Sequence, residues 1–178
     1  VASLVGSEMC IRDRGLGVVP LSFASAVAAV VNGGYLIEPT LYPRDKSYKT
    51  NAKLITSDVS ESMRYVMREV VKNGSGKKAD VDGYNVIGKT GTADKPCITG
   101  GYCGRMTSFV GAFPGNDPEY VVLVSLDNPK GKKDVRGSSA YWNAAPAAGE
   151  IIKLIAPQLN IPIQNNFSIF QEHARADN

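Results

Sequence analysis

The spacing of hydrophobic residues along the chain predicts three helices. The first begins at Pro20, extends over about 12 residues and ends at the Asn32-Gly33-Gly34 stop. Its apolar positions recur at helical spacing: Leu21, Ala24, Val27, Ala28 and Val31. The second has Ser57 or Asp58 as its N-cap and ends at Asn73-Gly74. Its apolar face is Val59, Met63, Val66, Met67 and Val70.

The third helix has Pro146 in its first turn and ends before Pro157. Its apolar stripe is Ala147, Ile151, Leu154 and Ile155. Such a stripe predicts a terminal helix packed on a sheet. Earlier in the chain, 35–42 is a short extended segment, which Pro39 confines to an edge or to irregular structure, and 43–51 is a polar loop.

Three segments have the composition of strands. Residues 107–113 and 120–126 are rich in β-branched and aromatic residues, and the five residues 114–118 between them predict a hairpin. Residues 121–124 are apolar on both faces, so we expect this strand to be central and covered on both sides. Residues 81–87 alternate loosely and continue into 88–93, whereas 94–105 is expected to be a loop. The sequence therefore predicts three antiparallel neighbours.

The third of these strands contains Gly88-Lys89-Thr90-Gly91-Thr92-Ala93. In an extended strand, Lys89 and Gly91 share one face, and Thr90 and Thr92 share the other. Gly91 leaves the backbone uncovered, so a ligand could pair with it as an added strand. Lys89 and the two hydroxyls can converge on an anionic ligand. The alternative is a loop lysine between two glycines.

Composition excludes several function classes. The 178 residues are 43% hydrophobic and 21% charged, which is typical of one globular domain. Net charge is +3, and the basic run 130–136 is interpreted as a solvated loop, so no nucleic-acid partner is expected. The longest apolar run, 26–31, is far shorter than the ~20 residues of a membrane helix.

The cysteines and histidine do not form a metal site. Cys10, Cys97 and Cys103 lack zinc-site spacing, and His173 is the only histidine, so neither a metal nor a cofactor is expected. Cys97 and Cys103 could form a disulfide in an oxidising compartment, and two free thiols are the alternative.

Two other motifs match by letter only. Residues 83–90 satisfy G-x-x-x-x-G-K-T, but a phosphate-binding loop needs a strand before the first glycine and a helix after the threonine, and here that order is reversed. Ser75 and Lys78 satisfy S-x-x-K, a nucleophile motif that requires a helix. Two glycines flank Ser75 and make a helix improbable, so we interpret 74–79 as a loop over the motif strand.

Lys89-Thr90-Gly91 is the K-T-G element of penicillin-interacting serine enzymes. Over most of 15–156 the chain resembles the class B penicillin-binding proteins, the peptidoglycan D,D-transpeptidases of cell elongation and division. The segments that show the resemblance are 15–21, 24–29, 32–34, 73–79, 88–93, 108–111, 120–124 and 144–146. It implies an α+β fold, a partial penicillin-binding-protein/β-lactamase-like transpeptidase fold with an antiparallel sheet flanked by helices.

The resemblance also implies roles for the motif residues. Lys89 would hold positive charge and assist proton transfer, and Thr90 and Thr92 would bind the carboxylate of a D-Ala-D-Ala stem or a β-lactam. The backbone N–H of Thr92 would be an oxyanion donor, and Gly91 would keep the strand face open. Expected partners are the peptidoglycan stem peptide, β-lactams, and membrane proteins of the divisome or elongasome, on the periplasmic side of the cell inner membrane.

The chain also departs from this family. The family's nucleophile motif and its S-x-N motif precede the K-T-G strand, and neither occurs between Gly15 and Lys89 once Ser75 is excluded. We therefore expect 15–160 to be the C-terminal part of the transpeptidase domain, without the attacking serine. Residues 1–14 resemble a translated adaptor rather than native sequence, and 161–178 are expected to be a polar tail. The alternatives are a β-lactam sensor or β-lactamase relative, and a non-catalytic domain that binds cell-wall peptides.

Overall fold

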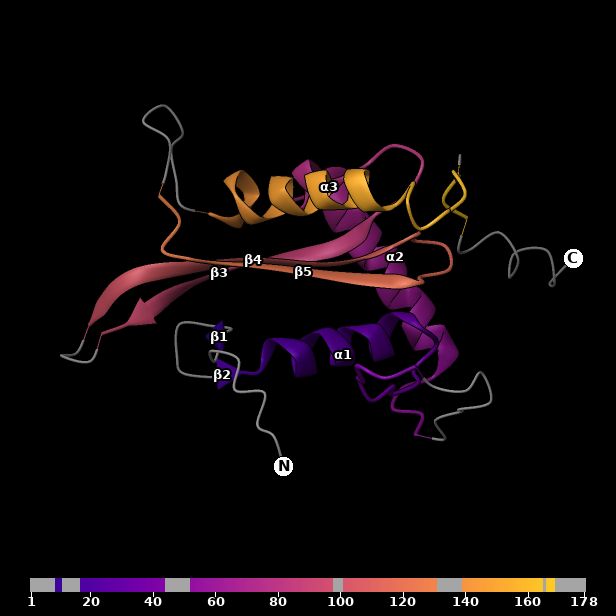
Figure 1. The fold of residues 1–178 in the computed structure, drawn as a ribbon, viewed down its shortest axis with the longest axis horizontal. Helices are drawn as coiled ribbons and strands as arrows, with labels where there is room; N and C mark the ends of the chain where they lie inside the picture. The colour runs from indigo at the N-terminus through magenta and orange to yellow at the C-terminus, as the bar shows by residue number, and fades with distance from the viewer. Residues whose placement is uncertain are drawn as a thin grey trace, which may run out of the picture.

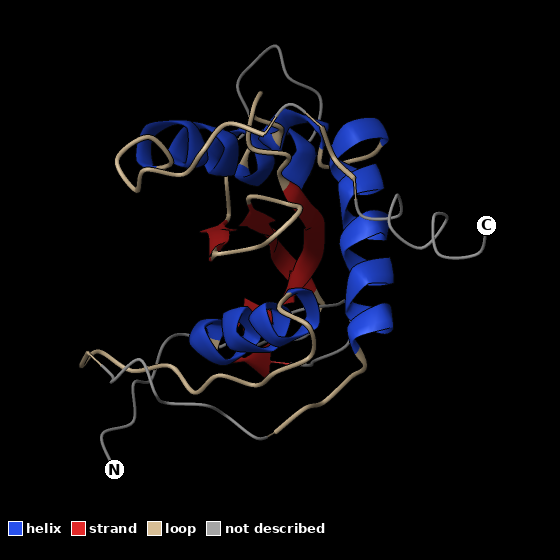
Figure 2. Cartoon of the chain, turned by 90° about the vertical axis from the view of Figure 1, so that its right-hand side faces the viewer, coloured by secondary structure: helices blue, strands red, loops and turns tan. Residues whose placement is uncertain are grey.

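The structure, a computed structural model, describes residues 9–10, 17–43, 52–97, 101–130, 139–164 and 166–168. Within them, a three-stranded antiparallel sheet lies between helix α1 (Pro20–Val31) on one face and helix α3 (Ala144–Ile155) on the other (Figure 1). Helix α2 (Ser57–Asn73) runs along one side of the sheet, from the α1 layer to the α3 layer (Figure 2). The predicted α+β class, an antiparallel sheet flanked by helices, is confirmed.

The sheet has the strand order β3 (Ile87–Pro96), β4 (Tyr102–Phe113), β5 (Tyr120–Asp127). The three antiparallel neighbours are therefore as predicted, but the central strand is β4, and the prediction that 120–126 is central was wrong. The pattern misled because α1 and α3 pack on opposite faces of β5, so this strand is covered on both sides although, among the described residues, it pairs only with β4.

The β3–β4 hairpin is longer than the sequence suggested. The expected loop over 94–105 was wrong for most of its length, because strand pairing continues to Lys95 opposite Gly104 before the register shifts. Cys97 and Cys103 then form a disulfide with a Cα–Cα distance of 5.3 Å. The sequence left open a disulfide or two free thiols, and the structure has the disulfide.

The start of β3 also differs from the expectation. Residues 82–85 form turns rather than a strand, with Gly83 at φ 83° and Asn85 at φ 46°. Left-handed backbone at both positions is incompatible with an extended strand. The motif strand therefore begins later than predicted, at Ile87, and extends further toward the C-terminus, to Pro96.

The helices occupy the expected segments, with differences at their caps and faces. The α2 N-cap is Thr56, whose hydroxyl accepts from the Val59 N–H at 3.3 Å, so the predicted caps Ser57 and Asp58 were wrong. In α3 the predicted stripe was also partly wrong, since Ile151 is 39% exposed and Leu154 is 64% exposed. The buried face consists mainly of small residues: Ala144, Ala145, Ala148, Gly149 and Ile152.

Small residues let α3 approach the short 3-10 helix η1 (Lys77–Ala79) closely. A Cβ added at Gly149 would lie 2.9 Å from the Lys78 carbonyl oxygen, so only glycine fits at this contact. A second 3-10 helix, η2 (Ala140–Trp142), leads directly into α3. Of these two short helices, η1 packs on α3 and α2, and η2 packs on β3.

The remaining regular structure is a two-stranded pair, β1 (Met9–Cys10) with β2 (Gly17–Val18), and an isolated bridge between Tyr35 and Lys53 in otherwise irregular chain. Most of 1–14, the loop 44–51, the basic run after Lys130 and the end of the tail lie outside the described residues. The assignments of 1–14 as non-native, 15–160 as domain and 161–178 as tail therefore stay predictions. No helix in the described part of the chain has the length and apolar character needed to span a bilayer.

Candidate active site

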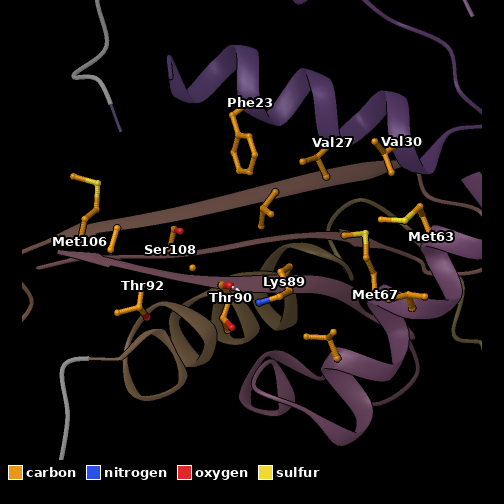
Figure 3. A pocket seen from close by; sticks show the side chains of 15 residues that line it. Phe23, Val27, Val30, Met63, Met67, Lys89, Thr90, Thr92, Met106 and Ser108 are labelled. Carbon is orange, nitrogen blue, oxygen red and sulfur yellow. Dashed lines mark hydrogen bonds between the residues drawn. The ribbon is translucent and has the colours of Figure 1, made fainter. Parts of the chain in front are cut away.

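An apolar cleft of about 520 Å³ lies between helices α1 and α2 and one face of the sheet (Figure 3). Phe23, Val27 and Val30 of α1 point toward the strands, and Met63 and Met67 come from α2. The β3 part of the lining is the motif itself, residues 89–93. The K-T-G strand therefore forms part of the wall of the cleft, beside residues of β4.

The two faces of β3 carry the side chains that the alternation predicted. On the α1 side, Ile87 packs in a buried cluster with Val31 and Met67, and Lys89 and Gly91 follow on the same face. Phe109, which lies opposite Thr90, belongs to the other core cluster, on the α3 side. Lys89 and the two threonines therefore leave the sheet on opposite faces.

One hydrogen bond at the end of the sheet shows which residues direct their backbone N–H and C=O groups toward which neighbouring strand. The Asn128 N–H donates to the Arg105 carbonyl at 2.8 Å, one step beyond the last pair of the β4–β5 ladder. Bonded and non-bonded pairs alternate along an antiparallel ladder, so Ser108, three residues after Arg105, directs its backbone groups toward β3. Its partner there is Gly91, which therefore bonds back to β4.

Thr90 and Thr92, the neighbours of Gly91, consequently direct their N–H and C=O groups away from β4. No strand among the described residues pairs with β3 on that side, so these groups form an open edge. The Lys89 ammonium lies at the same edge, where it donates to the Thr90 carbonyl oxygen at 2.8 Å. A cation, two backbone N–H groups and two hydroxyl-bearing residues therefore meet along one exposed strand edge.

Each threonine hydroxyl is held by a different segment. The Thr90 Oγ1 atom lies 2.6 Å from the Ser75 Oγ atom, which comes from the turn after α2. The Thr92 Oγ1 atom accepts the Ala140 N–H of η2 at 3.1 Å. Sequence reasoning found both threonines and placed 74–79 over the motif strand, but it did not find Ala140, because nothing in a local pattern links that residue to a strand 48 residues earlier.

The glycines of the motif permit close packing within the sheet. Gly88 lies opposite Gly111, and an added Cβ at Gly88 would meet the Phe109 ring and lie 2.7 Å from the Val110 carbonyl oxygen. At Gly91 an added Cβ would lie 2.5 Å from the Ser108 hydroxyl, in the space above the cleft face. The Ser108 hydroxyl therefore lies beside the space that Gly91 leaves, and the opening of this face to a ligand stays a prediction.

The structure agrees with the rejection of both letter-only motifs. After Thr90 the chain continues as strand, so the phosphate-binding loop is excluded. Ser75 lies in a turn and Lys78 in η1, and the Lys78 ammonium lies 3.9 Å from the centre of the Trp142 ring. The described residues also contain no cluster of histidine, cysteine and acidic side chains that could bind a metal.

Comparison with known proteins identifies the family. Residues 9–153 match the family described as the penicillin binding protein transpeptidase domain. The chain is 37% identical over 166 residues to stage V sporulation protein D of Bacillus subtilis, covering 86% of this chain and 25% of that protein. It is 38% identical over 160 residues to the probable peptidoglycan D,D-transpeptidase FtsI of Caulobacter vibrioides, covering 83% of this chain and 27% of that protein.

Solved structures agree with these sequence relatives. The apo transpeptidase domain of penicillin-binding protein 3 from Burkholderia pseudomallei has a TM-score of 0.74 at 29% identity, covering 85% of this chain and 45% of that one. Penicillin-binding protein 3 of Mycobacterium tuberculosis, complexed with aztreonam, has a TM-score of 0.70 at 26% identity, covering 85% and 37%. The chain thus spans about a quarter of the length of the curated relatives and less than half of the solved domain. With most of its length in these matches, the chain belongs to the penicillin-binding protein transpeptidase domain family, in its class B branch.

Proposed function

We propose that the protein to which this chain belongs is a serine D,D-transpeptidase that cross-links peptidoglycan, and that residues 87–96 form one wall of its active site. The observation that carries the proposal is the open edge of β3, where Thr90 and Thr92 direct backbone groups outward beside the Lys89 ammonium. An extended peptide can pair with such an edge as an added strand.

In this proposal the motif residues bind the carboxylate of the ligand and stabilise the oxyanion. Thr90 and Thr92 donate hydrogen bonds to the terminal carboxylate of a D-Ala-D-Ala stem or to that of a β-lactam, and Lys89 places positive charge beside it. The outward N–H of Thr92 donates to the oxyanion that forms at the attacked carbonyl, an interaction worth roughly 3 kcal/mol in comparable sites. Gly91 keeps the cleft face of the strand free for the ligand.

The reaction itself has two acyl transfers. A serine outside this chain adds to the D-Ala-D-Ala carbonyl carbon, the peptide C–N bond breaks, and the terminal D-Ala leaves with a protonated amine. An amine of a second stem then adds to the serine ester, releasing the serine hydroxyl and forming the cross-link. In this proposal the Lys89 ammonium stabilises the negative charge that develops in both steps.

Labelling with a fluorescent penicillin tests this proposal. We expect the product of the reading frame extended upstream of Gly15 to be labelled stoichiometrically, whereas the 178-residue chain alone stays unlabelled. Lys89→Ala is expected to slow labelling of the extended product by about 100-fold or more. The matched control is Lys95→Ala, on the same strand, because the Lys95 ammonium pairs with Asp127 at 2.7 Å instead of facing the motif.

Two results would count against the proposal. Stoichiometric labelling of the chain alone would show that its nucleophile lies within these 178 residues. An extended product that binds stem peptides but is never acylated would favour a non-catalytic binding domain.

We further propose that the protein works on the periplasmic side of the inner membrane with divisome or elongasome membrane proteins as partners. The Cys97–Cys103 disulfide supports an oxidising compartment, because such bonds are rare in the cytosol. Alkylation of intact cells with a membrane-impermeant maleimide tests the location. After mild reduction we expect these two thiols to be modified without cell lysis, and modification only after lysis would contradict it.

A further inference from the structure

The S-x-x-K serine has a contact that its motif does not explain. The Ser75 Oγ atom lies 2.6 Å from the Thr90 Oγ1 atom, although Ser75 is exposed and 15 residues earlier in the chain. Its own motif partner, Lys78, is engaged with the rings of Tyr141 and Trp142. Ser75 therefore faces the K-T-G threonine rather than a lysine that could take its proton.

The turn that carries Ser75 is held in place from α2. The N–H groups of Gly74 and Gly76, on either side of Ser75, both donate to the Val70 carbonyl, at 3.1 and 3.0 Å. A Cβ at Gly74 would lie 2.9 Å from that same oxygen, and one at Gly76 would lie 3.2 Å from it, so the turn favours glycine most strongly at Gly74. The serine between them is thereby directed at β3.

The same turn is anchored on its other side. The Ala79 N–H donates to the Gly76 carbonyl at 2.8 Å, and the Lys78 ammonium lies over the Trp142 ring. Asp80, which follows, is paired with Arg68 of α2 at 2.6 Å. With α2, η1 and η2 all fixing this segment, the Ser75 hydroxyl is a stationary partner for Thr90.

The hydrogen bond between the two hydroxyls can be arranged in two ways. Each has one hydrogen and two lone pairs, and either oxygen can be the donor in their bond. If Thr90 donates to Ser75, it presents only lone pairs outward and repels a carboxylate. If Ser75 donates to Thr90, the Thr90 hydrogen is free to point at the ligand, and the bond from Ser75 polarises it further.

We infer that Ser75 is a positioning residue that donates to Thr90 and thereby holds the Thr90 hydroxyl ready to donate to the carboxylate of the ligand. This inference rests on the proposed function of the K-T-G strand and adds a residue outside that strand to it. Ser75 itself forms no bond to the reacting atoms. Its effect should therefore appear in the binding of the carboxylate and not in the chemical step.

The test measures acylation of the extended product by a fluorescent penicillin over a range of concentrations, which separates the apparent dissociation constant from the limiting acylation rate. For Ser75→Ala we expect an apparent dissociation constant about three- to tenfold higher, the effect of one lost hydrogen bond, with an unchanged limiting rate. Ser75→Thr keeps the hydroxyl and should restore binding. Ser62→Ala, on the exposed side of α2, is the matched control and should behave as wild type.

A double-mutant cycle separates this role from a general structural one. In a Thr90→Val background, Ser75→Ala should cause no further loss, since it acts only through the missing hydroxyl. Additive losses, a slower limiting rate at unchanged affinity, or wild-type binding by Ser75→Ala would each overturn the inference and leave the proposed function intact. If wild-type extended product is not acylated, the proposed function and this inference both fall.

Discussion

Reduction of the Cys97–Cys103 disulfide should destabilise the fold by a predictable amount. The two cysteines are six positions apart in the sequence, so their bond closes a loop of seven residues at the tip of the β3–β4 hairpin. The chain-entropy relation for a loop of this length gives about 2.4 kcal/mol of stabilisation at 25 °C. For a chain of this size, with a urea m-value of about 2 kcal/mol/M, the unfolding midpoint should fall by roughly 1 M.

The assay is urea unfolding of the 178-residue chain, followed by the fluorescence of its one tryptophan, with and without a phosphine reductant. A Cys10→Ala background leaves only the two bridged cysteines. The Cys97→Ala/Cys103→Ala double variant should match the reduced protein and ignore the reductant. Identical midpoints for the oxidised and reduced chain would refute the reasoning, because the bond would then restrict nothing in the unfolded state.

Three substitutions test the packing that supports the site. Gly88→Ala should destabilise the chain by about 2 kcal/mol, since the new Cβ would lie 2.7 Å from the Val110 carbonyl oxygen; unchanged urea stability would contradict that contact. Ile152→Ala should cost about 3 kcal/mol because its side chain is fully buried under the sheet, and a loss below about 1 kcal/mol would show that α3 is loosely packed. Arg68→Ala should cost about 3 kcal/mol by leaving Asp80 half-buried without its partner; adding Asp80→Asn, which removes that charge, should recover part of the loss, and purely additive losses would contradict this reason.

The helices and the motif strand could be predicted from sequence because the relevant signals are local. Pro20 and the Asn32-Gly33-Gly34 stop bound α1, and the alternation of Lys89 to Thr92 assigned their faces correctly. A helical period and a strand period need only near neighbours in the chain. These are the features on which the family resemblance also depended.

The differences arise where distant packing overrides local pattern. In α3 the large residues Ile151 and Leu154 suggested the buried face, but close approach to η1 selected alanine and glycine instead. For β5, the helices packed on both faces explain why its composition is that of a central strand, although among the described residues it pairs only with β4.

The contacts of the site were equally inaccessible to sequence reasoning. The hydrogen bond between the Ser75 and Thr90 hydroxyls, and the bond from the Ala140 N–H to Thr92, join segments that no period relates. Ser75 was singled out through a motif that it does not serve, and its segment was expected over the motif strand, but its bond to Thr90 was not predicted. Contacts of this kind can be identified only from the three-dimensional arrangement of the sheet and the segments that pack on it.

The open edge of β3 also has a consequence for solubility. An unpaired strand edge is a template for the edge of another molecule, so a surface that can bind an extended peptide is also a route to aggregation. The charge of Lys89 opposes that route, because its ammonium lies at the open edge, on the Thr90 carbonyl oxygen. Replacing Lys89 with a neutral residue should therefore shorten the time that concentrated protein stays in solution, quite apart from any loss of activity.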